Sequence, residues 1–396
     1  MLRIAEKSKI CYNFFILLRL LAKNLNRKAV LTIMKKIVLT GGGTAGHVTP
    51  NIALLPYLKE AGYDVTYMGS YDGIEKKLIA DFDIPYLGIS TGKFRRYLDT
   101  RNLTDPFRVV KGFAEARKYL KEIAPDVIFS KGGFVSVPVV RAAASLKIPC
   151  IIHESDMTPG LANKICIPVS HKVCCNFPET LEKLPEGKAV LTGSPIREEL
   201  TQGNKLLGLD MCGFTANKPV LMVMGGSQGA AAVNKAVREA LPQLLENFQV
   251  VHLCGKGKLD NIYLTTPGYK QFEYIKAELK DLFAMADIVI SRAGANAICE
   301  LLALKKPNLL IPLPASGSRG DQLLNAASFE AQGFSIVINE DDLTTNLLVN
   351  KVNELYEKRQ HFTEVMGTSK QMDSIPMIMR LIEEAVSQTA YTHEHN

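Results

Sequence analysis

The sequence predicts an α/β protein built from two tandem, doubly wound domains. Its 396 residues exceed what one hydrophobic core usually organises. From Lys36 onward, short apolar runs alternate with helix-length segments, the pattern of parallel strands buried on both faces. An apolar run followed by a glycine-rich loop also occurs twice, beginning at Gly41 and Gly225, about one domain length apart. We therefore expect two similar α/β units with a cleft between them.

We expect the first domain to span residues 34–195. Its predicted strands lie in KIVLT (36–40), DVTYMG (64–69), DVIFSKGG (126–133), PCIIHE (149–154), HKVCCN (171–176) and AVLTGSP (189–195). Each run is four to six apolar or β-branched residues long, as buried strands are. A turn-rich stretch, 193–219, is where we expect the chain to leave this domain.

We expect the second domain to span residues 196–375. Its predicted strands lie in KPVLMVM (218–224), FQVVHLCG (248–255), FEYI (272–275), the two apolar runs of 286–314, and FSIVIN (334–339). Residues 376–396 are expected to form a C-terminal helix and tail, with the helix packing back on the first domain. Strand order cannot be read from the sequence.

Residues 1–33 are basic and apolar but do not match an exported or membrane-spanning segment. Arg19 interrupts the apolar run, which is shorter than the ~20 residues of a spanning helix, and no small-residue cleavage site follows. We interpret them as an extension upstream of Met34, with an amphipathic surface anchor as the alternative.

The composition indicates an ordinary globular protein, with 47% hydrophobic and 22% charged residues. A net charge of +7 favours phosphates or anionic lipid as partners but is too small to indicate nucleic acid. The eight cysteines include no CxxC pair and are expected to be buried thiols in a reducing compartment. Adjacent Cys174 and Cys175 near His171 do not favour a zinc site.

The first glycine loop satisfies GxGxxG at Gly41, Gly43 and Gly46. A dinucleotide site would also need a carboxylate about 20 residues on, where the chain has Gly69 and Ser70. We therefore do not favour NAD. Glycines and the N–H groups of a following helix still suit an anion. His47 would then either cap that helix and touch phosphate, or act as general base toward an acceptor hydroxyl, the interpretation we favour.

Two further segments, in the second half of the chain, are also predicted to contact a ligand. The loop Gly225–Ala230 adds the Ser227 hydroxyl, with a tight packing turn as the alternative interpretation. In SRAGANAICE a helix is expected to begin near Ala295, which places Glu300 one or two turns inside it, where a carboxylate could accept both hydroxyls of a ribose. Asp321 and Gln322 precede another predicted helix.

Other patterns are less specific. The Asp81–Phe82–Asp83 triplet resembles a metal-binding DxD but falls in a predicted turn, and covalent hydrolase chemistry is not expected. Residues 93–111 interleave basic and aromatic side chains, which suits either a solvated face or docking on an anionic membrane or lipid diphosphate. The basic residues are Lys93, Arg95, Arg96, Arg101, Arg108 and Lys111, and the apolar ones are Phe94, Tyr97, Leu98 and Phe107.

Seven motifs in order resemble one bacterial family: the UDP-N-acetylglucosamine:N-acetylmuramyl-(pentapeptide) pyrophosphoryl-undecaprenol N-acetylglucosamine transferases. They are GGGTAGH, KGGFVSVP, HESDMTPGLANK, GSPIRE, GGSQGA, SRAGANAICELLALKKPNLLIPLP and RGDQLLNA, and they are spread over most of residues 35–330. The resemblance implies two Rossmann-like domains (the GT-B glycosyltransferase architecture) and inverting transfer of GlcNAc from UDP-GlcNAc to the MurNAc 4-hydroxyl of lipid I. The product would be lipid II, for peptidoglycan synthesis, cell shape and division.

The resemblance also implies site residues. Catalytic candidates are His47 and Glu154. The donor UDP-GlcNAc would be bound by Thr44, Ala45, Gly46, Asp156, Arg197, Ser227, Gln228, Ile275, Gly294, Ala295, Glu300 and Gln322. The acceptor would be bound by Gly42, Gly43, His153 and Glu154. Within these motifs, Ala45 replaces a frequent glycine, Asp156 a frequent asparagine and Asp321 a frequent glutamine.

The implied reaction is a single displacement that uses no built-in metal or cofactor, because helix N-termini stabilise the departing UDP. Expected partners are UDP-GlcNAc, lipid I, the anionic inner leaflet of the cell membrane and cell-wall synthesis or division proteins, with no nucleic acid. The expected location is peripheral, on the cytoplasmic side of the membrane. The alternatives are a diacylglycerol glycosyltransferase, a UDP-GlcNAc 2-epimerase, or a non-catalytic protein that binds nucleotide sugars at the membrane.

Overall fold

The computed structural model describes residues 34–92, 101–226, 230–316, 320–369, 371 and 374–394, with side chains at all of these except 101–106 and 389–394. The predicted extension 1–33 lies outside these ranges. So do the basic and aromatic residues from Lys93 to Leu98, and Ser227 and Gln228 of the second glycine loop.

The first sheet has seven parallel strands in the order β3-β2-β1-β4-β5-β6-β7. The strands are β1 (Lys36–Thr40), β2 (Asp64–Ser70), β3 (Tyr86–Ile89), β4 (Val127–Ser130), β5 (Cys150–Glu154), β6 (Lys172–Cys175) and β7 (Ala189–Leu191). The order reverses between β1 and β4, which is where ligands bind in open sheets of this kind.

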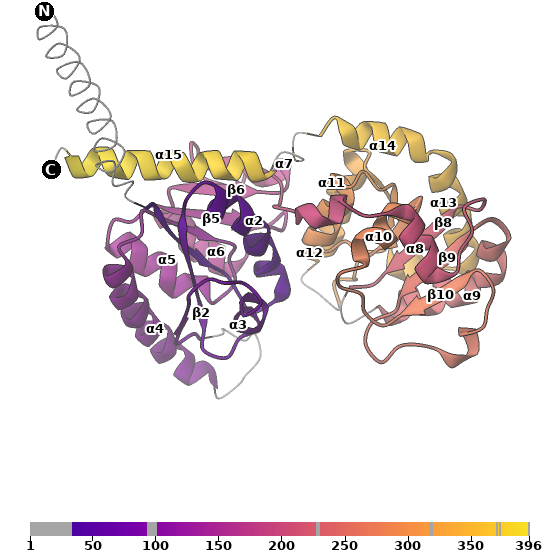
Figure 1. The fold of residues 1–396 in the computed structure, drawn as a ribbon, viewed down its shortest axis with the longest axis horizontal. Helices are drawn as coiled ribbons and strands as arrows, with labels where there is room; N and C mark the ends of the chain where they lie inside the picture. Colours follow the sequence, from indigo (N-terminus) through magenta and orange to yellow (C-terminus); the bar gives the residue numbers. More distant parts are fainter. Residues whose placement is uncertain are drawn as a thin grey trace, which may run out of the picture. The chain divides into compact units, whose positions relative to one another are not determined.

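Helices cover both faces of this sheet (Figure 1). They are η1 (Ala45–His47), α2 (Thr49–Glu60), α3 (Ile74–Ile79), α4 (Arg101–Ile123), α5 (Ser136–Ser145), α6 (Leu161–Cys166), η2 (Ile167–Val169) and α7 (Pro178–Leu181). Alternate residues of each strand point to opposite faces, so Ile37 and Leu39 join one hydrophobic cluster while Val38 joins the other.

The second sheet has six parallel strands in the order β10-β9-β8-β11-β12-β13. They are β8 (Val220–Met224), β9 (Gln249–Leu253), β10 (Tyr269–Phe272), β11 (Ile288–Ser291), β12 (Asn308–Leu310) and β13 (Ser335–Val337). The same reversal occurs here between β8 and β11. Each glycine-rich loop therefore begins at the end of a strand that borders a switch point.

The remaining helices follow the strands of the second sheet. They are η3 (Glu198–Thr201), α8 (Lys205–Cys212), α9 (Ala231–Asn247), η4 (Asn261–Tyr263), α10 (Leu279–Met285), α11 (Ala295–Ala303), α12 (Asp321–Ala331), η5 (Glu340–Asp342), α13 (Thr345–Glu357), α14 (Arg359–Gly367) and α15 (Ser374–Glu394). Helix α15 returns to the first sheet, where Ile378, Ile382 and Ala385 share a buried cluster with Ile37 and Leu39 (Figure 1).

One predicted strand was wrong in its position. The run 272–275 was expected to be extended, but the strand is β10, Tyr269–Phe272. Tyr269 and Gln271 point into the protein while Lys270 is exposed, so the true strand has the alternation of a half-buried edge. The chain leaves the sheet at Glu273, and Tyr274 is exposed.

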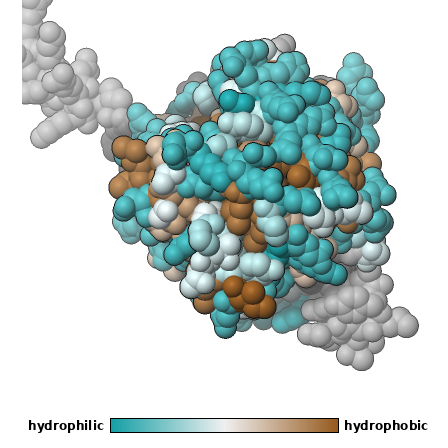
Figure 2. All heavy atoms as spheres, turned by 90° about the vertical axis from the view of Figure 1, so that its right-hand side faces the viewer, coloured by the Kyte–Doolittle hydropathy of each residue, from teal (hydrophilic) through white to brown (hydrophobic). Residues whose placement is uncertain are grey.

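The surface in Figure 2 is mainly hydrophilic, with small brown patches separated by teal. Among the helices that the structure describes, none is both long and apolar enough to cross a membrane.

Candidate functional site

The first three glycines of the first loop, Gly41–Gly43, are packed so closely that side chains would not fit there. Gly43 has φ +84°, which favours glycine, and a Cβ there would lie 2.5 Å from Cε1 of Phe134. A Cβ on Gly133, which follows β4, would clash with the Gly42 carbonyl and lie 3.0 Å from His47 Nδ1. The loops after β1 and β4 thus meet around His47.

The His47 ring is oriented by its own loop. Its Nδ1 lies 3.2 Å from the carbonyl oxygen of Gly42 and 3.1 Å from Oγ1 of Thr44. A carbonyl oxygen can only accept, so the contact with Gly42 assigns the proton to Nδ1 and the lone pair of the neutral ring to Nε2. This is the tautomer of a base that takes a proton at Nε2.

A buried carboxylate that the sequence analysis missed holds this loop. Glu75, in the first turn of α3, has no solvent exposure. It accepts hydrogen bonds from the Gly43 N–H at 3.1 Å, the Ser70 N–H at 3.0 Å and the Ser70 hydroxyl. An acid at a helix start has an ordinary explanation in the helix dipole, so no sequence pattern distinguishes it. The Gly43 N–H is therefore occupied by Glu75 and is not among the amides that this loop could offer to an anion.

Glu154 organises the loop that follows β5. One oxygen accepts from the Asp156 N–H at 3.1 Å, and the other from the Gly160 N–H at 3.0 Å and from Asn163 Nδ2 at 2.8 Å. Burial raises the pKa of Glu154, although these hydrogen bonds act in the opposite direction. Both oxygens are thus engaged by the protein, and Glu154 holds the loop that follows β5.

His153 lies in a buried polar cluster with Lys131. The Lys131 Nζ is 2.7 Å from His153 Nδ1, 2.8 Å from Ser155 Oγ and 3.4 Å from Ser194 Oγ. His153 Nε2 donates to the Gly193 carbonyl at 2.8 Å, so Nδ1 accepts from the lysine. Burial lowers the pKa of His153 well below its usual range, and it lowers that of Lys131 to about 8.

His153 has no solvent exposure. Both ring nitrogens and the whole ring surface face protein, and its contact with the acceptor stays a prediction from the family resemblance. Lys131 was not predicted as part of the site, although it begins the KGGFVSVP motif. Nothing in the sequence says that this lysine is buried.

On the donor side, helix α11 begins where the sequence predicted, with Gly294 before it and Ala295 as its first residue. A Cβ on Gly294 would meet nothing within 4 Å, so the helix N-terminus is approachable. Burial raises the pKa of Glu300 to about 7, while the Arg197 cation opposes that rise. Arg197 Nη1 pairs with Glu199 at 2.8 Å, and its buried Nε has no hydrogen-bond partner among the residues described.

Two asparagines of the second half contact loops of the first. Asn296 Nδ2 donates to the Gly46 carbonyl at 2.9 Å. Asn325 of α12 accepts from the Met157 N–H and donates to Oδ1 of Asp156, both at 3.2 Å. Both residues stand in motifs quoted from the sequence, but an asparagine in a helix gives no indication that it reaches another domain.

The other predicted donor residues are more scattered. Gln322, in the first turn of α12, accepts from the Leu313 N–H at 3.0 Å. Ile275 is half-buried against the cluster that contains Val251 and Leu282. Thr44 and Ala45 are exposed at the tip of the first loop. Among the residues that the structure describes, no hydrogen bond joins Gln322 to Glu300.

Within the ranges that the structure covers, no group of three His, Cys, Asp or Glu side chains could hold a metal ion. Cys174 and Cys175 belong to hydrophobic clusters on opposite faces of the sheet, so their thiols cannot share an ion. Asp81 and Asp83 are exposed in the turn between α3 and β3.

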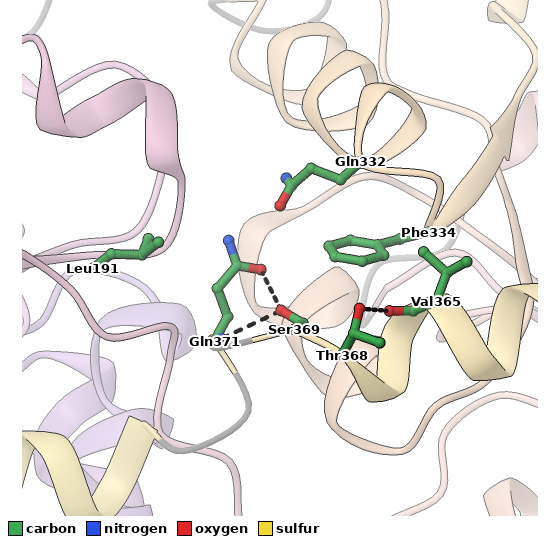
Figure 3. Close-up of a pocket in the computed structure, with 7 residues that line it drawn as sticks. All are labelled: Leu191, Gln332, Phe334, Val365, Thr368, Ser369 and Gln371. Carbon is green, nitrogen blue, oxygen red and sulfur yellow. Dashed lines mark hydrogen bonds between the residues drawn. The ribbon is translucent and has the colours of Figure 1, made fainter.

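Cavities flank the segments that connect the two sheets. One of about 310 Å³ contains none of the predicted site residues (Figure 3). It is lined by Leu191, Gln332, Phe334, Val365, Thr368, Ser369 and Gln371. A second, of about 290 Å³, is bordered by Arg197, Cys299 and Gln371 among others. Gln371 lines both cavities, and its Nε2 donates to the Asn176 carbonyl at 2.9 Å.

Two parallel α/β sheets of this order, each with a glycine-rich loop beside the point where the strand order reverses, form the two-domain GT-B architecture found in nucleotide-sugar glycosyltransferases. The glycosyltransferase family 28 N-terminal domain matches residues 37–174, and the family 28 C-terminal domain matches residues 220–379. The chain belongs to the UDP-N-acetylglucosamine–N-acetylmuramyl-(pentapeptide) pyrophosphoryl-undecaprenol N-acetylglucosamine transferases. The predicted family and fold class are thus confirmed.

Two relatives with that name have a high sequence identity to this chain. The Lachnospira eligens protein is 66% identical over 351 residues, which are 89% of this chain and 99% of the relative. The Lachnoclostridium phytofermentans protein is 64% identical over the same extent. Among solved structures, Acinetobacter baumannii MurG matches with a TM-score of 0.70 and 26% identity, over 88% of this chain and 99% of that one. The calicheamicin glycosyltransferase CalG4, at 15% identity and a TM-score of 0.64 over 89% of this chain and 98% of its own, shares the fold alone.

Proposed function

We propose that the protein transfers GlcNAc from UDP-GlcNAc to the 4-hydroxyl of MurNAc in lipid I, undecaprenyl-pyrophosphoryl-MurNAc-pentapeptide, and so forms lipid II for peptidoglycan synthesis. The observation that carries this proposal is the 66% identity to a transferase of that name over nearly its whole length. The same observation favours this acceptor over diacylglycerol, and transfer over epimerisation or binding alone.

The proposed mechanism is one displacement with inversion. His47 Nε2 takes the proton of the acceptor 4-hydroxyl as that oxygen attacks the anomeric carbon of GlcNAc. The new bond joins the acceptor oxygen to that carbon, while the bond from the carbon to the UDP oxygen breaks and leaves its electron pair on UDP. The Nδ1 contacts of His47 with Gly42 and Thr44 support this assignment. Glu154 is then a framework residue.

The departing UDP needs stabilisation of negative charge. We assign this role to the N-termini of α9 and α11, together with Arg197. Glu300 would accept the ribose hydroxyls, since its carboxylate receives no hydrogen bond from the residues that the structure describes. Thr44, Ala45, Gly46, Asp156, Ser227, Gln228, Ile275 and Gln322 as donor contacts, and Gly42 and Gly43 as acceptor contacts, remain proposals from family resemblance.

The test measures transfer of radiolabelled GlcNAc from UDP-GlcNAc to lipid I and, in parallel, to diacylglycerol. We expect label in lipid II only, and UDP release only when lipid I is present. His47→Ala should lower kcat by about 100-fold if the imidazole is the base, whereas His361→Ala, at an exposed position of α14, should change nothing. Label in diacylglycerol would overturn the acceptor assignment, and near-normal turnover of H47A would remove His47 as base.

We also propose that the protein binds the cytoplasmic face of the membrane peripherally, where its lipid-linked acceptor resides. On α4 the side chains of Phe107 and Val110 are 77% and 68% exposed, next to the exposed cation Lys111. Apolar side chains beside basic ones suit the boundary of an anionic bilayer. Contacts with cell-wall synthesis and division proteins remain a prediction without an assigned surface.

Sedimentation with vesicles tests this surface. The wild type should bind vesicles that contain anionic phosphatidylglycerol, and less so as salt rises. Phe107→Ser combined with Val110→Ser should lose most of this binding. The matched control is Ile262→Ser with Leu264→Ser, two exposed apolar residues of the second half. Equal loss in both pairs would contradict the assignment to α4.

A further inference from the structure

The peptide group between Gly42 and Gly43 contacts a functional side chain at each end. Its N–H, from Gly43, donates to Oε2 of Glu75 at 3.1 Å. Its carbonyl oxygen, from Gly42, lies 3.2 Å from His47 Nδ1. The N–H and C=O of a planar trans peptide point in opposite directions. Glu75 and His47 therefore lie on opposite sides of one peptide, connected through it.

Glu75 is placed there by close packing. It has no solvent exposure, and a Cβ on Gly42 would lie 2.5 Å from its Cδ. The Gly43 N–H, the Ser70 N–H and the Ser70 hydroxyl all donate to its oxygens, the pattern that a carboxylate anion satisfies. Burial and then the Glu75 carboxylate raise the pKa of Tyr86. A buried anion thus sits directly behind the loop that carries His47.

We propose that Glu75 is a positioning residue that acts on His47 through the Gly42–Gly43 peptide. A carboxylate that accepts from the N–H of a peptide polarises it and makes its carbonyl a stronger acceptor. The stronger carbonyl favours the Nδ1–H tautomer of His47 and stabilises the imidazolium formed when Nε2 takes the acceptor proton. The arrangement is a carboxylate–histidine pair with one peptide inserted between the partners.

This inference rests on the proposed role of His47 in the transfer. In the step itself, the proton moves from the acceptor hydroxyl to Nε2, and Glu75 neither gains nor loses one. The arrangement also distinguishes the first loop from the second. Because a buried anion lies behind the first loop, this loop suits an acceptor hydroxyl from which a proton is removed better than it suits a negatively charged diphosphate.

The direct test is the pKa of His47 in the full-length protein, measured by NMR of the imidazole C–H signals and assigned with H47A. Glu75→Gln removes the charge, so the imidazolium loses stabilisation, and we expect the pKa of His47 to fall by about 0.5 or more, less than for a direct charge contact. The matched control is Asp72→Asn, which removes one exposed carboxylate three residues away. It should leave the pKa of His47 unchanged.

Glu75→Asp distinguishes an effect transmitted through the Gly42–Gly43 peptide, the relay, from a direct electrostatic effect of the charge through space. The shorter side chain keeps the charge but moves it away from the Gly43 N–H. The relay therefore predicts a lower pKa of His47 in this variant too, whereas a direct electrostatic effect predicts no change in that pKa. In activity assays, the acid limb of kcat/KM should move to lower pH in E75Q and kcat should fall about 10-fold, with KM for UDP-GlcNAc little changed.

Circular dichroism and the Tm establish whether E75Q and E75D are folded. One folded variant is enough for the measurement of the His47 pKa. An unchanged His47 pKa in a folded variant overturns the proposal. If E75Q lowers that pKa while H47A keeps normal turnover, the relay stands and the proposed catalytic role of His47 fails. The two ideas are therefore tested separately.

Discussion

Asn296 donates a 2.9 Å hydrogen bond from Nδ2 to the carbonyl oxygen of Gly46. Asn296 is the second residue of α11, whose N-terminus we assign to the donor, and Gly46 lies in η1, one residue before His47. A Cβ on Gly46 would lie 3.0 Å from the same Nδ2, so the approach depends on glycine. One side chain thus joins the helix that would bind the donor to the loop that carries the proposed base.

We expect Asn296→Ala to lower kcat/KM for UDP-GlcNAc about 10-fold. The variant loses a hydrogen bond worth about 1.4 kcal/mol, so α11 would be held less firmly against the loop that carries His47. The matched control is Asn346→Ala, at an exposed position near the start of α13. Steady-state kinetics with lipid I at saturation measure the effect. Equal kinetics for N296A and wild type would show that this contact does not contribute.

Donor binding should depend on pH through Glu300, whose pKa burial raises to about 7. Ribose hydroxyls donate to the ionised carboxylate, so the ligand favours the deprotonated form, and affinity should increase as pH rises through 7. Calorimetric titration with UDP-GlcNAc should give a Kd about 10-fold lower at pH 8 than at pH 6. Glu300→Gln should bind more weakly and lose this dependence. A variant that keeps the pH dependence would assign it to another group.

Lys131 should make stability depend on alkaline pH. Burial lowers its pKa to about 8, so between pH 8 and its unfolded pKa of about 10.4 the unfolded state binds more protons than the folded state. Stability from this residue therefore increases with pH in that window, by at most ~1.4 kcal/mol per pH unit. The Tm of wild type relative to Lys131→Met should rise from pH 8 to pH 10. Lys118→Met, at a 73% exposed side chain, should show no such trend.

Helix α15 should stabilise the first domain although it follows the second in the chain. Ile382 has no solvent exposure and shares a cluster with Ile37 and Leu39. Ile382→Ala should lower the free energy of unfolding by about 2–5 kcal/mol through the cavity it leaves. Glu383→Ala, its exposed neighbour, should be close to neutral. Scanning calorimetry measures both, and KM for UDP-GlcNAc at a temperature where both are folded should be unchanged.

Much of the fold could be predicted from local patterns. Apolar runs located the strands of both sheets except β3, which was not included, and β10, which was placed near its end. Edge strands alternate rather than run continuously apolar, so Tyr269–Phe272 has a weaker pattern than the run Phe272–Ile275, which begins at its last residue. The start of α11 was predicted because a glycine after a strand and an alanine-rich run have a local meaning.

The sequence by itself determined the α/β class, the two glycine loops and the family, because apolar periodicity, glycine and ordered motifs depend on neighbours along the chain. Only the tertiary structure decided that Glu75 lies behind the first loop, that Lys131 and His153 are buried together, and that Asn296 reaches Gly46. Each of these contacts joins residues at least 22 positions apart. Burial and hydrogen-bond partners at that separation are set by strand order and packing, which leave no periodic mark in the sequence.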